Sequence, residues 1–264
     1  MSSLDHRYWA RYLQRAVDER RAVPGIGAQI GELSLHDAYQ IQDTLVAEKV
    51  FAGDSLAGAK LGLTSKAKQE QMGVDEPAYG WVPSSSVLDA PTGEPVDVVV
   101  GDLIHPRVEP EFVFVIGDEL SSPTCTADQV LDATERVVGG IEVIDSRYEA
   151  FKFTLPDVIA DNTSAALALI GQGGIAPRDV DLAAIECRFT VDGEEKGTAT
   201  GAALLGSPAE CVAMLVQHLA KKDRGLAPGW IVLAGAPLGA EPLHVGTVAV
   251  ASYSDFGDVV MRGA

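Results

Sequence analysis

One apolar segment that contains two acids constrains the fold and chemistry of this chain more than any other. Residues 103–116, LIHPRVEPEFVFVI, are rich in β-branched and aromatic residues, which predicts a β-strand. Glu109 and Glu111 lie two residues apart in it, so their side chains point to the same face, with Cα atoms about 6.6 Å apart. Two carboxylates about 5 Å apart, at an effective dielectric constant of about 20, repel by about 3 kcal/mol.

Two arrangements would explain this pair of acids. A hard divalent cation prefers oxygen ligands and could bind both carboxylates. Alternatively, the segment is an edge strand whose polar face is solvated. A third acid, Glu142, interrupts a second apolar segment at residues 141–145. Three acids in two apolar strands are harder to explain as solvated surface, so the sequence favours a metal site.

Composition narrows the class of protein. The chain has 264 residues, 47% of them hydrophobic, which suits one large or two small globular domains. Its net charge of −18 argues against nucleic acid and anionic membranes as partners. The three cysteines show no CxxC spacing, and we find no apolar signal core or membrane-length apolar run. These features predict reduced thiols and a cytoplasmic protein.

Helical patterns come first along the chain. An amphipathic helix over residues 4–22 and a second helix starting at Ser34 precede every strand-like segment. We therefore predict an N-terminal helical cap (residues 1–57) and a catalytic β-rich region (58–264), joined as one continuous structural unit. The further elements that the pattern predicts are a strand carrying Lys60, a helix from Ser65 to Gly73, a helix over 126–138 stopped by Gly139 and Gly140, an irregular connection over 146–166, a hairpin turn at 191–194, a helix from Ser207, and strands at 230–234 and 248–253.

Two basic side chains near these segments have open roles. Lys60 lies in GAKLGL, among small and apolar residues. Its side chain either extends to the surface, which we expect from the sequence alone, or is held near a buried anion. His105 is the only histidine close in sequence to the acids, and it is either a general base or a hydrogen-bonding loop residue.

Five motifs in order resemble a known family. They are KLGLTSKAKQEQMGV (60–74), LIHPRVEPE (103–111), EVIDSRYEAFKF (142–153), ADNTSA (160–165) and TGAALLGSP (200–208). This series resembles the decarboxylases and hydratases of catechol meta-cleavage pathways, which belong to the fumarylacetoacetate-hydrolase superfamily. The resemblance implies an α+β fold, a mixed β-rich roll with peripheral helices, assembled into homo-oligomers.

The resemblance also implies a set of site residues and a cofactor. In that family an ExE pair and a later glutamate bind Mg²⁺ or Mn²⁺, and these match Glu109, Glu111 and Glu142. The family lysine beside the substrate matches Lys60, and it serves as a cation near the developing charge or as a proton shuttle. The substrate, a small 2-oxo dicarboxylic acid, is then expected to contact Leu61, Lys152, Asp161 and Ser164.

The choice of reaction depends on fewer residues. Hydratases of this family have an acid before a Gly-Phe-Leu segment, and Ala78 stands at that place here. The DSRYEAFKF run is also more similar to the decarboxylases. We therefore predict decarboxylation of 2-oxohex-3-enedioate to 2-hydroxypenta-2,4-dienoate, in complex with a partner hydratase. The alternatives are 2-hydroxypenta-2,4-dienoate hydratase or a non-catalytic protein that binds 2-oxo acids. The AGAPLG loop (234–239) departs from the family pattern and affects the choice of substrate.

Overall fold

Two β-sheets form the centre of the protein, which the computed structural model describes over residues 4–64 and 77–264. The helix predicted over residues 65–73 lies outside this range. The larger sheet has the order β2-β1-β10-β5-β6-β7-β3, and β11 also pairs with β5. Its strands are β1 (Leu56–Gly62), β2 (Ala78–Pro83), β3 (Val87–Ala90), β5 (Arg107–Ile116), β6 (Thr134–Ile144), β7 (Ala165–Gly171), β10 (Ile231–Leu233) and β11 (Glu241–Pro242).

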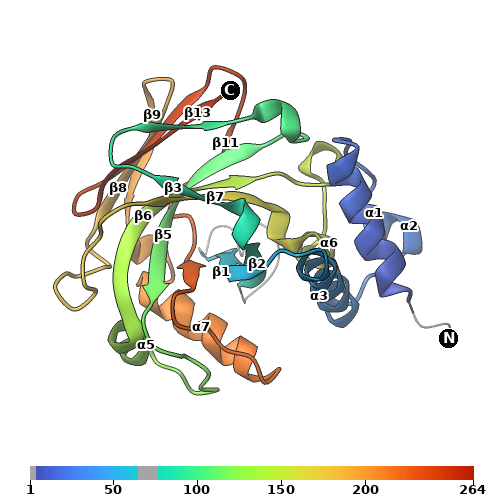
Figure 1. The fold of residues 1–264 in the computed structure, drawn as a ribbon, viewed down its shortest axis with the longest axis horizontal. Helices are drawn as coiled ribbons and strands as arrows, with labels where there is room; N and C mark the ends of the chain where they lie inside the picture. The colour runs from blue at the N-terminus through green and yellow to red at the C-terminus, as the bar shows by residue number, and fades with distance from the viewer. Residues whose placement is uncertain (1–3, 65–76) are drawn as a thin grey trace.

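The smaller sheet packs against the larger one (Figure 1). Its order is β4-β13-β12-β8-β9, and its strands are β4 (Pro95–Val98), β8 (Glu186–Val191), β9 (Glu194–Thr200), β12 (Val248–Tyr253) and β13 (Gly257–Gly263). Phe112 of β5 meets Tyr253 of β12 in the core between the sheets. The predicted hairpin turn is confirmed, because Asp192 and Gly193 join β8 to β9 with φ of 52° and 79°.

The larger sheet rolls up on itself. Val82 of β2 and Ala168 of β7 lie toward opposite ends of the strand order, yet both belong to one buried cluster with Val113 of β5 and Leu233 of β10. Strands so far apart in the order can share a cluster only if the sheet curves around it. The curvature creates an inner face that is shielded from water.

Strand β5 lies inside the larger sheet and is buried on both faces. Phe112 and Phe114 point into the core between the sheets, whereas Val113 points into the inner cluster. Since side chains alternate along a strand, Glu109 and Glu111 lie on the inner face with Val113. The alternative of a solvated edge strand is wrong, because β10 and β6 pair with the two edges of β5.

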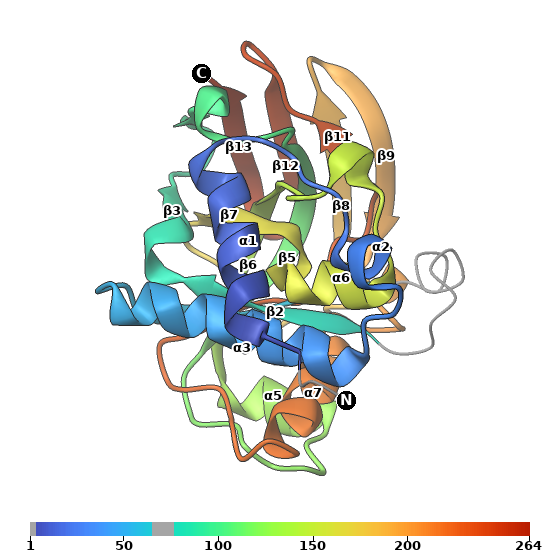
Figure 2. The same cartoon turned by 90° about the vertical axis from the view of Figure 1, so that its right-hand side faces the viewer.

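Three helices cover one end of the sheets (Figure 2). They are α1 (His6–Asp18), α2 (Ile26–Ile30) and α3 (Leu35–Phe51). Asp5 and Ser34 accept backbone hydrogen bonds as the N-caps of α1 and α3. Leu13 and Ile41 pack in a second core with Tyr148, which lies near α6 (Leu155–Ala160). The predicted N-terminal helices are therefore present, and the α+β class is confirmed, while the division at residue 57 stays a prediction.

The helix predicted over residues 126–138 is wrong in its second half. Helix α5 spans only Ala127–Ala133, and β6 continues from Thr134 through Gly139 and Gly140. A Cβ on Gly139 would lie 2.4 Å from the ring of Tyr253, and one on Gly140 would lie 2.7 Å from Val113 Cγ2. These two glycines therefore permit close packing within a strand and do not stop a helix.

The connection predicted over residues 146–166 is more regular than expected. It contains α6 and two short 3₁₀ turns, η3 (Glu149–Phe151) and η4 (Asn162–Ser164). Thr154 and Asp157 form a reciprocal capping box at the start of α6. This capping pair was present in the sequence as a helix signal that the prediction did not use.

Helix α7 (Pro208–Ala220) begins after Ser207, as predicted, and packs against α5 and β1. The segment Gly201–Ala220 is long and apolar enough to cross a membrane by length and composition alone. Half of it is buried inside the protein, which is typical of a core helix. The other described 3₁₀ turns are η1 (Ser84–Ser86), η2 (Val100–Asp102) and η5 (Gly201–Ala203).

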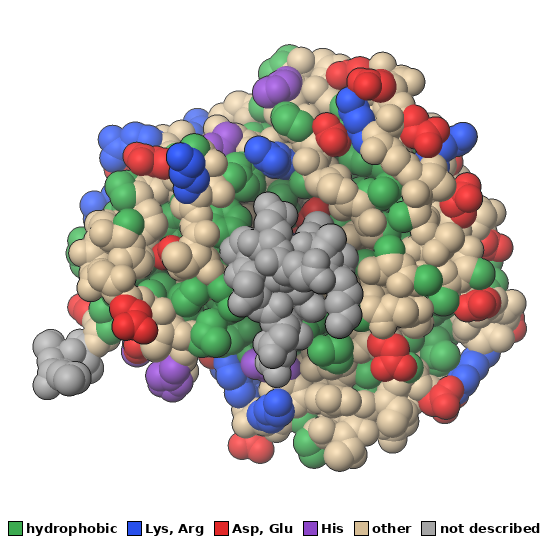
Figure 3. Space-filling view, turned by 180° about the vertical axis from the view of Figure 1, so that it is seen from behind, with side chains coloured by type: hydrophobic (Ala, Val, Ile, Leu, Met, Phe, Trp, Pro, Cys, Tyr) green, Lys and Arg blue, Asp and Glu red, His purple; other side chains and the backbone are tan. Residues whose placement is uncertain are grey.

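Charged side chains are scattered over the face shown in Figure 3. Lys and Arg side chains do not gather into one patch there, and acidic side chains lie mostly toward the edge. A nucleic-acid-binding face would instead concentrate basic residues.

Candidate metal centre

Three buried glutamates meet on the inner face of the larger sheet. Glu109 and Glu111 project from β5, and the antiparallel register places Glu142 of β6 directly opposite Glu109. One carboxylate oxygen from each lies within 4.8 Å of the other two. The three residues are 8%, 0% and 2% exposed, respectively. The structure thus brings the three predicted metal ligands to one point.

The electrostatics of this cluster favour a bound cation. Burial raises the pKa of Glu111 well above its usual range, and the carboxylates of Glu142 and Glu109 raise it further. Lys60 and the Gly235 N–H, which donates to Glu111 Oε2 at 2.7 Å, lower this pKa. Within residues 4–64 and 77–264, Glu111 Oε1 is buried without a hydrogen-bond donor.

A buried oxygen without a donor is costly, and so is the repulsion among three carboxylates. A divalent cation would satisfy that oxygen and offset the repulsion at once. Three carboxylate oxygens suit Mg²⁺ or Mn²⁺, which keep further coordination positions for water or substrate. The donor set therefore fits the predicted cofactor.

Lys60 is held inside the protein beside this cluster. It is 2% exposed, and its Nζ lies 2.6 Å from Glu142 Oε1. The same Nζ donates a hydrogen bond to the carbonyl oxygen of Thr163 at 3.0 Å. The expectation that Lys60 extends to the surface is therefore wrong, and the alternative of a buried anion partner holds, because the register of β1 directs the side chain inward.

A left-handed turn provides the carbonyl that holds Lys60. Asn162, Thr163 and Ser164 have φ of 50°, 53° and 59°, and each such non-glycine residue costs about 1–2 kcal/mol. The Asn162 side chain stabilises the turn by pairing with the backbone of Trp81, accepting at 2.8 Å and donating at 2.9 Å. Strain maintained in this way is typical of functional sites.

Gly80 makes the close approach of this turn possible. A Cβ at Gly80 would lie 2.5 Å from Thr163 Oγ1 and 2.9 Å from Asn162 O. Gly80 also pairs with Lys60 in the β1–β2 register. One small residue therefore lets the turn lie against the strand that neighbours Lys60.

Asp161 and Ser164 occupy different layers of the site. Ser164 lines the cavity beside the metal cluster, and its hydroxyl donates to Asp161 Oδ2 at 3.2 Å. Asp161 is fully buried, with Arg147 Nε 3.2 Å from its Oδ1. Burial raises the pKa of Asp161 to about 7, although Arg147 and the Ser164 hydroxyl act to lower it. Asp161 thus orients Ser164 from behind the cavity wall.

The cavity has a volume of about 280 Å³ and a mostly apolar wall. Lys60, Leu61, Glu109 and Ser164 all line it, so the structure joins these predicted residues in one site. Lys152 does not line this cavity, and its side chain is exposed. Its predicted contact with substrate has no support in this geometry.

The 234–239 loop contributes to the site, as its departure from the family pattern suggested. Ala236 lines the cavity, and Gly235 donates to Glu111. Gly235 has φ +127°, and a Cβ there would lie 2.0 Å from Thr64 Oγ1. His105, by contrast, donates from Nε2 to the Ser146 carbonyl at 2.6 Å, which fits the hydrogen-bonding role.

Arg107 and Phe151 also line the cavity, and sequence reasoning missed both. The alternation of side chains could have found Arg107, because it lies two residues before Glu109 on the same strand. Phe151 had no such signal, since its position depends on φ of 55° at Ala150 and 54° at Phe151. The Arg107 guanidinium lies 4.6 Å from the centre of the Phe151 ring.

Comparison with known proteins places this geometry among characterised enzymes. Residues 54–262 match the family model described as fumarylacetoacetate (FAA) hydrolase C-terminal. A 4-oxalocrotonate decarboxylase of Pseudomonas sp. (strain CF600) is 35% identical, over 96% of this chain and 94% of the relative. A 2-hydroxypent-2,4-dienoate hydratase of Pseudomonas putida is also 35% identical, over 78% of this chain and 92% of the relative.

A solved structure agrees closely with the whole fold. The 4-oxalocrotonate decarboxylase from Pseudomonas putida G7, complexed with magnesium and adipate, matches with a TM-score of 0.93 and 32% identity. The match covers 100% of this chain and 99% of that one. The predicted roll of the fumarylacetoacetate-hydrolase type is thus confirmed. The chain belongs to the fumarylacetoacetate hydrolase family.

Proposed function

We propose that this chain is a lyase, dependent on a divalent cation, that converts 2-oxohex-3-enedioate into 2-hydroxypenta-2,4-dienoate and CO₂. The observation that carries the proposal is the buried Glu109–Glu111–Glu142 cluster, with Lys60 beside it, at an apolar cavity. The similarity to 4-oxalocrotonate decarboxylases over nearly the whole chain supports it.

The three glutamates would hold Mg²⁺ or Mn²⁺. When bound, the cation supplies a Lewis acid for the 2-oxo acid end of the substrate. The surrounding protein orients two of the ligands, because the Gly235 N–H donates to Glu111 at 2.7 Å and Lys60 contacts Glu142 at 2.6 Å. Such contacts to metal ligands usually affect metal affinity.

The reaction breaks the C5–C6 bond of the substrate. Its electron pair moves through the conjugated C3=C4 bond to the 2-oxo oxygen, CO₂ leaves, and a proton ends on that oxygen. Lys60 Nζ supplies positive charge where the electrons arrive and is the proton donor. Its contacts with Glu142 and Thr163 hold it in place, so little reorganisation is needed during the reaction.

Ala78 supports decarboxylation over hydration. It lines the cavity with a methyl group, which cannot transfer a proton to or from water. The apolar wall, with residues such as Ile144, Phe153 and Val158, also limits water at the reacting atoms. Hydration of 2-hydroxypenta-2,4-dienoate remains the second candidate, because a hydratase is as similar as a decarboxylase in percent identity.

Product analysis tests the proposal. Purified protein with Mg²⁺ should release CO₂ from 2-oxohex-3-enedioate and should stop when a chelator is added. Formation of 4-hydroxy-2-oxopentanoate from 2-hydroxypenta-2,4-dienoate, without CO₂ release from the diacid, would instead support the hydratase. Neither product, together with metal-dependent binding of a 2-oxo acid, would indicate a binding protein.

The protein acts in the cytoplasm as a homo-oligomer and associates with a hydratase that consumes its product. The support for the association with a hydratase is chemical, because the product proposed here is the compound named in the hydratase relative. Native mass spectrometry of the protein, alone and mixed with a 2-hydroxypent-2,4-dienoate hydratase, tests both associations.

A further inference from the structure

Arg107 is a cation beside the metal cluster to which the proposed reaction gives no role. It is partly buried and lines the cavity. Among residues 4–64 and 77–264, no carboxylate lies within 4.0 Å of its guanidinium nitrogens, although the protein carries 38 acidic residues. Its described contact is the face of Phe151. Since acids outnumber lysines and arginines by 18, a guanidinium that pairs with no acid of the described ranges is notable.

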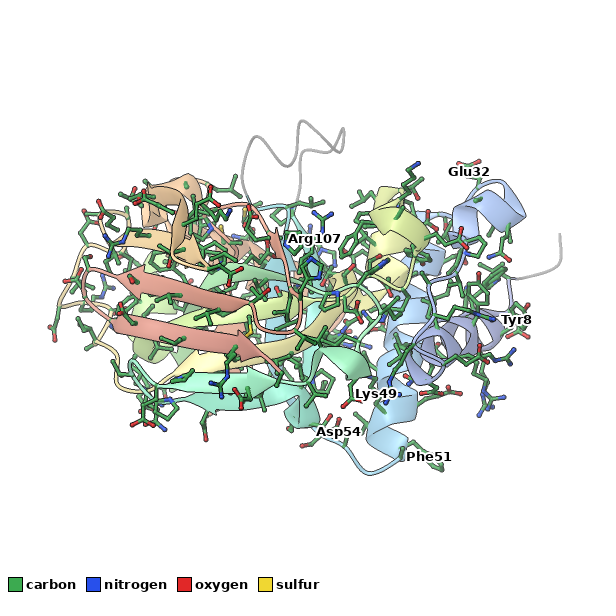
Figure 4. All side chains as sticks on the ribbon, turned by 90° about the horizontal axis from the view of Figure 1, so that it is seen from above. Tyr8, Glu32, Lys49, Phe51, Asp54 and Arg107 are labelled. Carbon is green, nitrogen blue, oxygen red and sulfur yellow. The ribbon has the colours of Figure 1, made fainter. Side chains whose placement is uncertain are left out.

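The position of Arg107 relates it directly to the metal ligands. It is the first residue of β5 and shares the inner face with Glu109 and Glu111, because all three alternate along one strand. Its Cα is therefore about 6.6 Å from that of Glu109. Figure 4 shows Arg107 near the middle of the molecule, between the strands and the N-terminal helices.

The second cation that lines this cavity cannot take the role of Arg107. Lys60 already contacts Glu142 Oε1 and the Thr163 carbonyl. Within the described ranges the Arg107 guanidinium donates no hydrogen bond, and its central carbon lies 4.6 Å from the centre of the Phe151 ring. A planar fork of N–H donors matches a carboxylate bidentately.

We propose that Arg107 binds the second carboxylate of the substrate and so selects dicarboxylic over monocarboxylic 2-oxo acids. This inference rests on the proposed function, since it assumes that the 2-oxo acid end lies at the glutamate cluster. A six-carbon diacid has its carboxyl carbons about 6 Å apart, from five bonds of about 1.5 Å. That length is comparable to the spacing between Glu109 and Arg107 along β5.

The contact should act on binding more than on the chemical step. Arg107 stabilises the distal group as a carboxylate, which is its form in the substrate, and the charge leaves this group as CO₂ forms. An interaction made in the ground state lowers KM without raising kcat. Arg107→Met should therefore raise KM for 2-oxohex-3-enedioate by at least about tenfold, with a smaller change in kcat.

A pair of stable ligands tests the proposal without turnover. We would measure binding of 2-oxohexanedioate and 2-oxohexanoate to the Mn²⁺-loaded protein by calorimetry. The natural protein should bind the diacid at least about tenfold more tightly, and Arg107→Met should abolish this preference while its affinity for 2-oxohexanoate stays unchanged. Arg107→Lys should keep part of the preference, because it retains charge but not the planar fork.

Arg188→Met is the matched control, because Arg188 is exposed on β8 of the other sheet and its loss changes the net charge equally. It should leave both affinities unchanged. Equal binding of the two ligands by the natural protein would overturn the inference. An Arg107→Met variant that binds both ligands more weakly by the same factor would also overturn it, because Arg107 would then only pack with Phe151 in the cavity wall.

The two proposals fail in different ways. A preference for the diacid that depends on Arg107, without CO₂ release from 2-oxohex-3-enedioate, contradicts only the proposed reaction. CO₂ release without any preference between the ligands contradicts only the role of Arg107. Thermal unfolding of each variant establishes that it is folded, and Arg107→Lys provides a second reading if Arg107→Met is unstable.

Discussion

Glu111 has the most constrained environment of the three metal ligands. It is fully buried, its Oε2 accepts from Gly235, and its Oε1 has no donor within the described ranges 4–64 and 77–264. Glutamine keeps the shape of the side chain and can still accept from Gly235, but it removes the negative charge. The Glu111→Gln substitution therefore tests the metal-binding role of this side chain while preserving its packing.

We predict that Glu111→Gln lowers Mn²⁺ affinity by at least about 100-fold and abolishes CO₂ release. In the metal-free protein the same change should raise the melting temperature, because one of three mutually repelling buried carboxylates is gone. Calorimetric Mn²⁺ titration and thermal unfolding measure the two effects. Glu186→Gln, at an exposed position of β8, is the control. Unchanged Mn²⁺ affinity in Glu111→Gln would refute the ligand assignment.

Asp161 makes stability depend on pH in a direction that can be calculated. Its pKa is raised from 3.8 to about 7, so the folded protein binds this proton more tightly than the unfolded chain does. The stabilisation from this proton is complete below the unfolded pKa and is lost as pH rises toward 7. Relative to Asp161→Asn, the natural protein should therefore lose unfolding free energy between pH 3.8 and about 7.

Urea unfolding of both proteins at several pH values measures this difference. If the unfolding free energy of the natural protein instead rose with pH relative to Asp161→Asn, the Arg147 ion pair would outweigh burial and the prediction would be contradicted. Asp145→Asn is a less suitable comparison, because the Asp145 carboxylate accepts hydrogen bonds from the backbone of Ile104 and His105.

At the scale of elements, the contact between β2 and the η4 turn controls the position of Lys60. We predict that Gly80→Ala lowers kcat by about 100-fold, because the new methyl group displaces Thr163 and moves its carbonyl away from Lys60. Mn²⁺ affinity should change little, since Gly80 lies on β2 and the three glutamates lie on β5 and β6.

Gly101→Ala is the control for this variant, because a Cβ at Gly101 meets no atom within 4 Å. Steady-state rates and Mn²⁺ titrations of both variants give the comparison. Full activity of Gly80→Ala would show that the turn adjusts without cost and would remove its assigned role.

Local sequence signals predicted some elements well and others poorly, for identifiable reasons. The run of β-branched and aromatic residues predicted β5, and Ser34 with Asp37 predicted the start of α3. The start of β6 was wrongly predicted as helix because Gly139 and Gly140 usually interrupt elements. The role of Gly139 depends on Tyr253, which is more than 100 residues away in sequence and whose ring packs on it from the other sheet, and the role of Gly140 depends on Val113 of β5.

The same distinction applies to the site. The spacing of Glu109 and Glu111 and the resemblance to known enzymes were enough to predict the ligand set. The burial of Lys60 was not predictable from its neighbours, because it depends on Glu142 and on a left-handed turn at residues 162–164. Phe151 could not be found either, since only the folded backbone directs its ring into the cavity.

For the molecule as a whole, two exposed hydrophobic side chains at the end of α3 bear on self-association. Phe51 at the end of α3 is 94% exposed, and Val50 beside it is 45% exposed. Figure 4 shows Phe51 at the outer edge of the N-terminal helices. Neighbouring exposed hydrophobic side chains that form a contiguous patch can mark an interaction site. The proposed homo-oligomer would bury them.

We predict that Phe51→Ser shifts the protein toward smaller assemblies in light scattering after size-exclusion chromatography. Val245→Ser is the matched control, because Val245 is also highly exposed, at 73%, but lies outside the N-terminal helices. A natural protein that is monomeric at all concentrations would contradict the proposal of a homo-oligomer. An unchanged mass for Phe51→Ser would place the contact elsewhere.

The three carboxylates all come from a single antiparallel pair, β5 and β6, whereas most of the cavity wall comes from segments spread over the rest of the chain. Apart from Arg107 and Ile144, which β5 and β6 supply, the residues that shape the cavity are thus encoded separately from the cation ligands. New substrates could be accommodated by exchanging wall residues such as Ala236 or Phe151 while the β5–β6 ribbon is left untouched. This division offers a rational starting point for redesigning the enzyme.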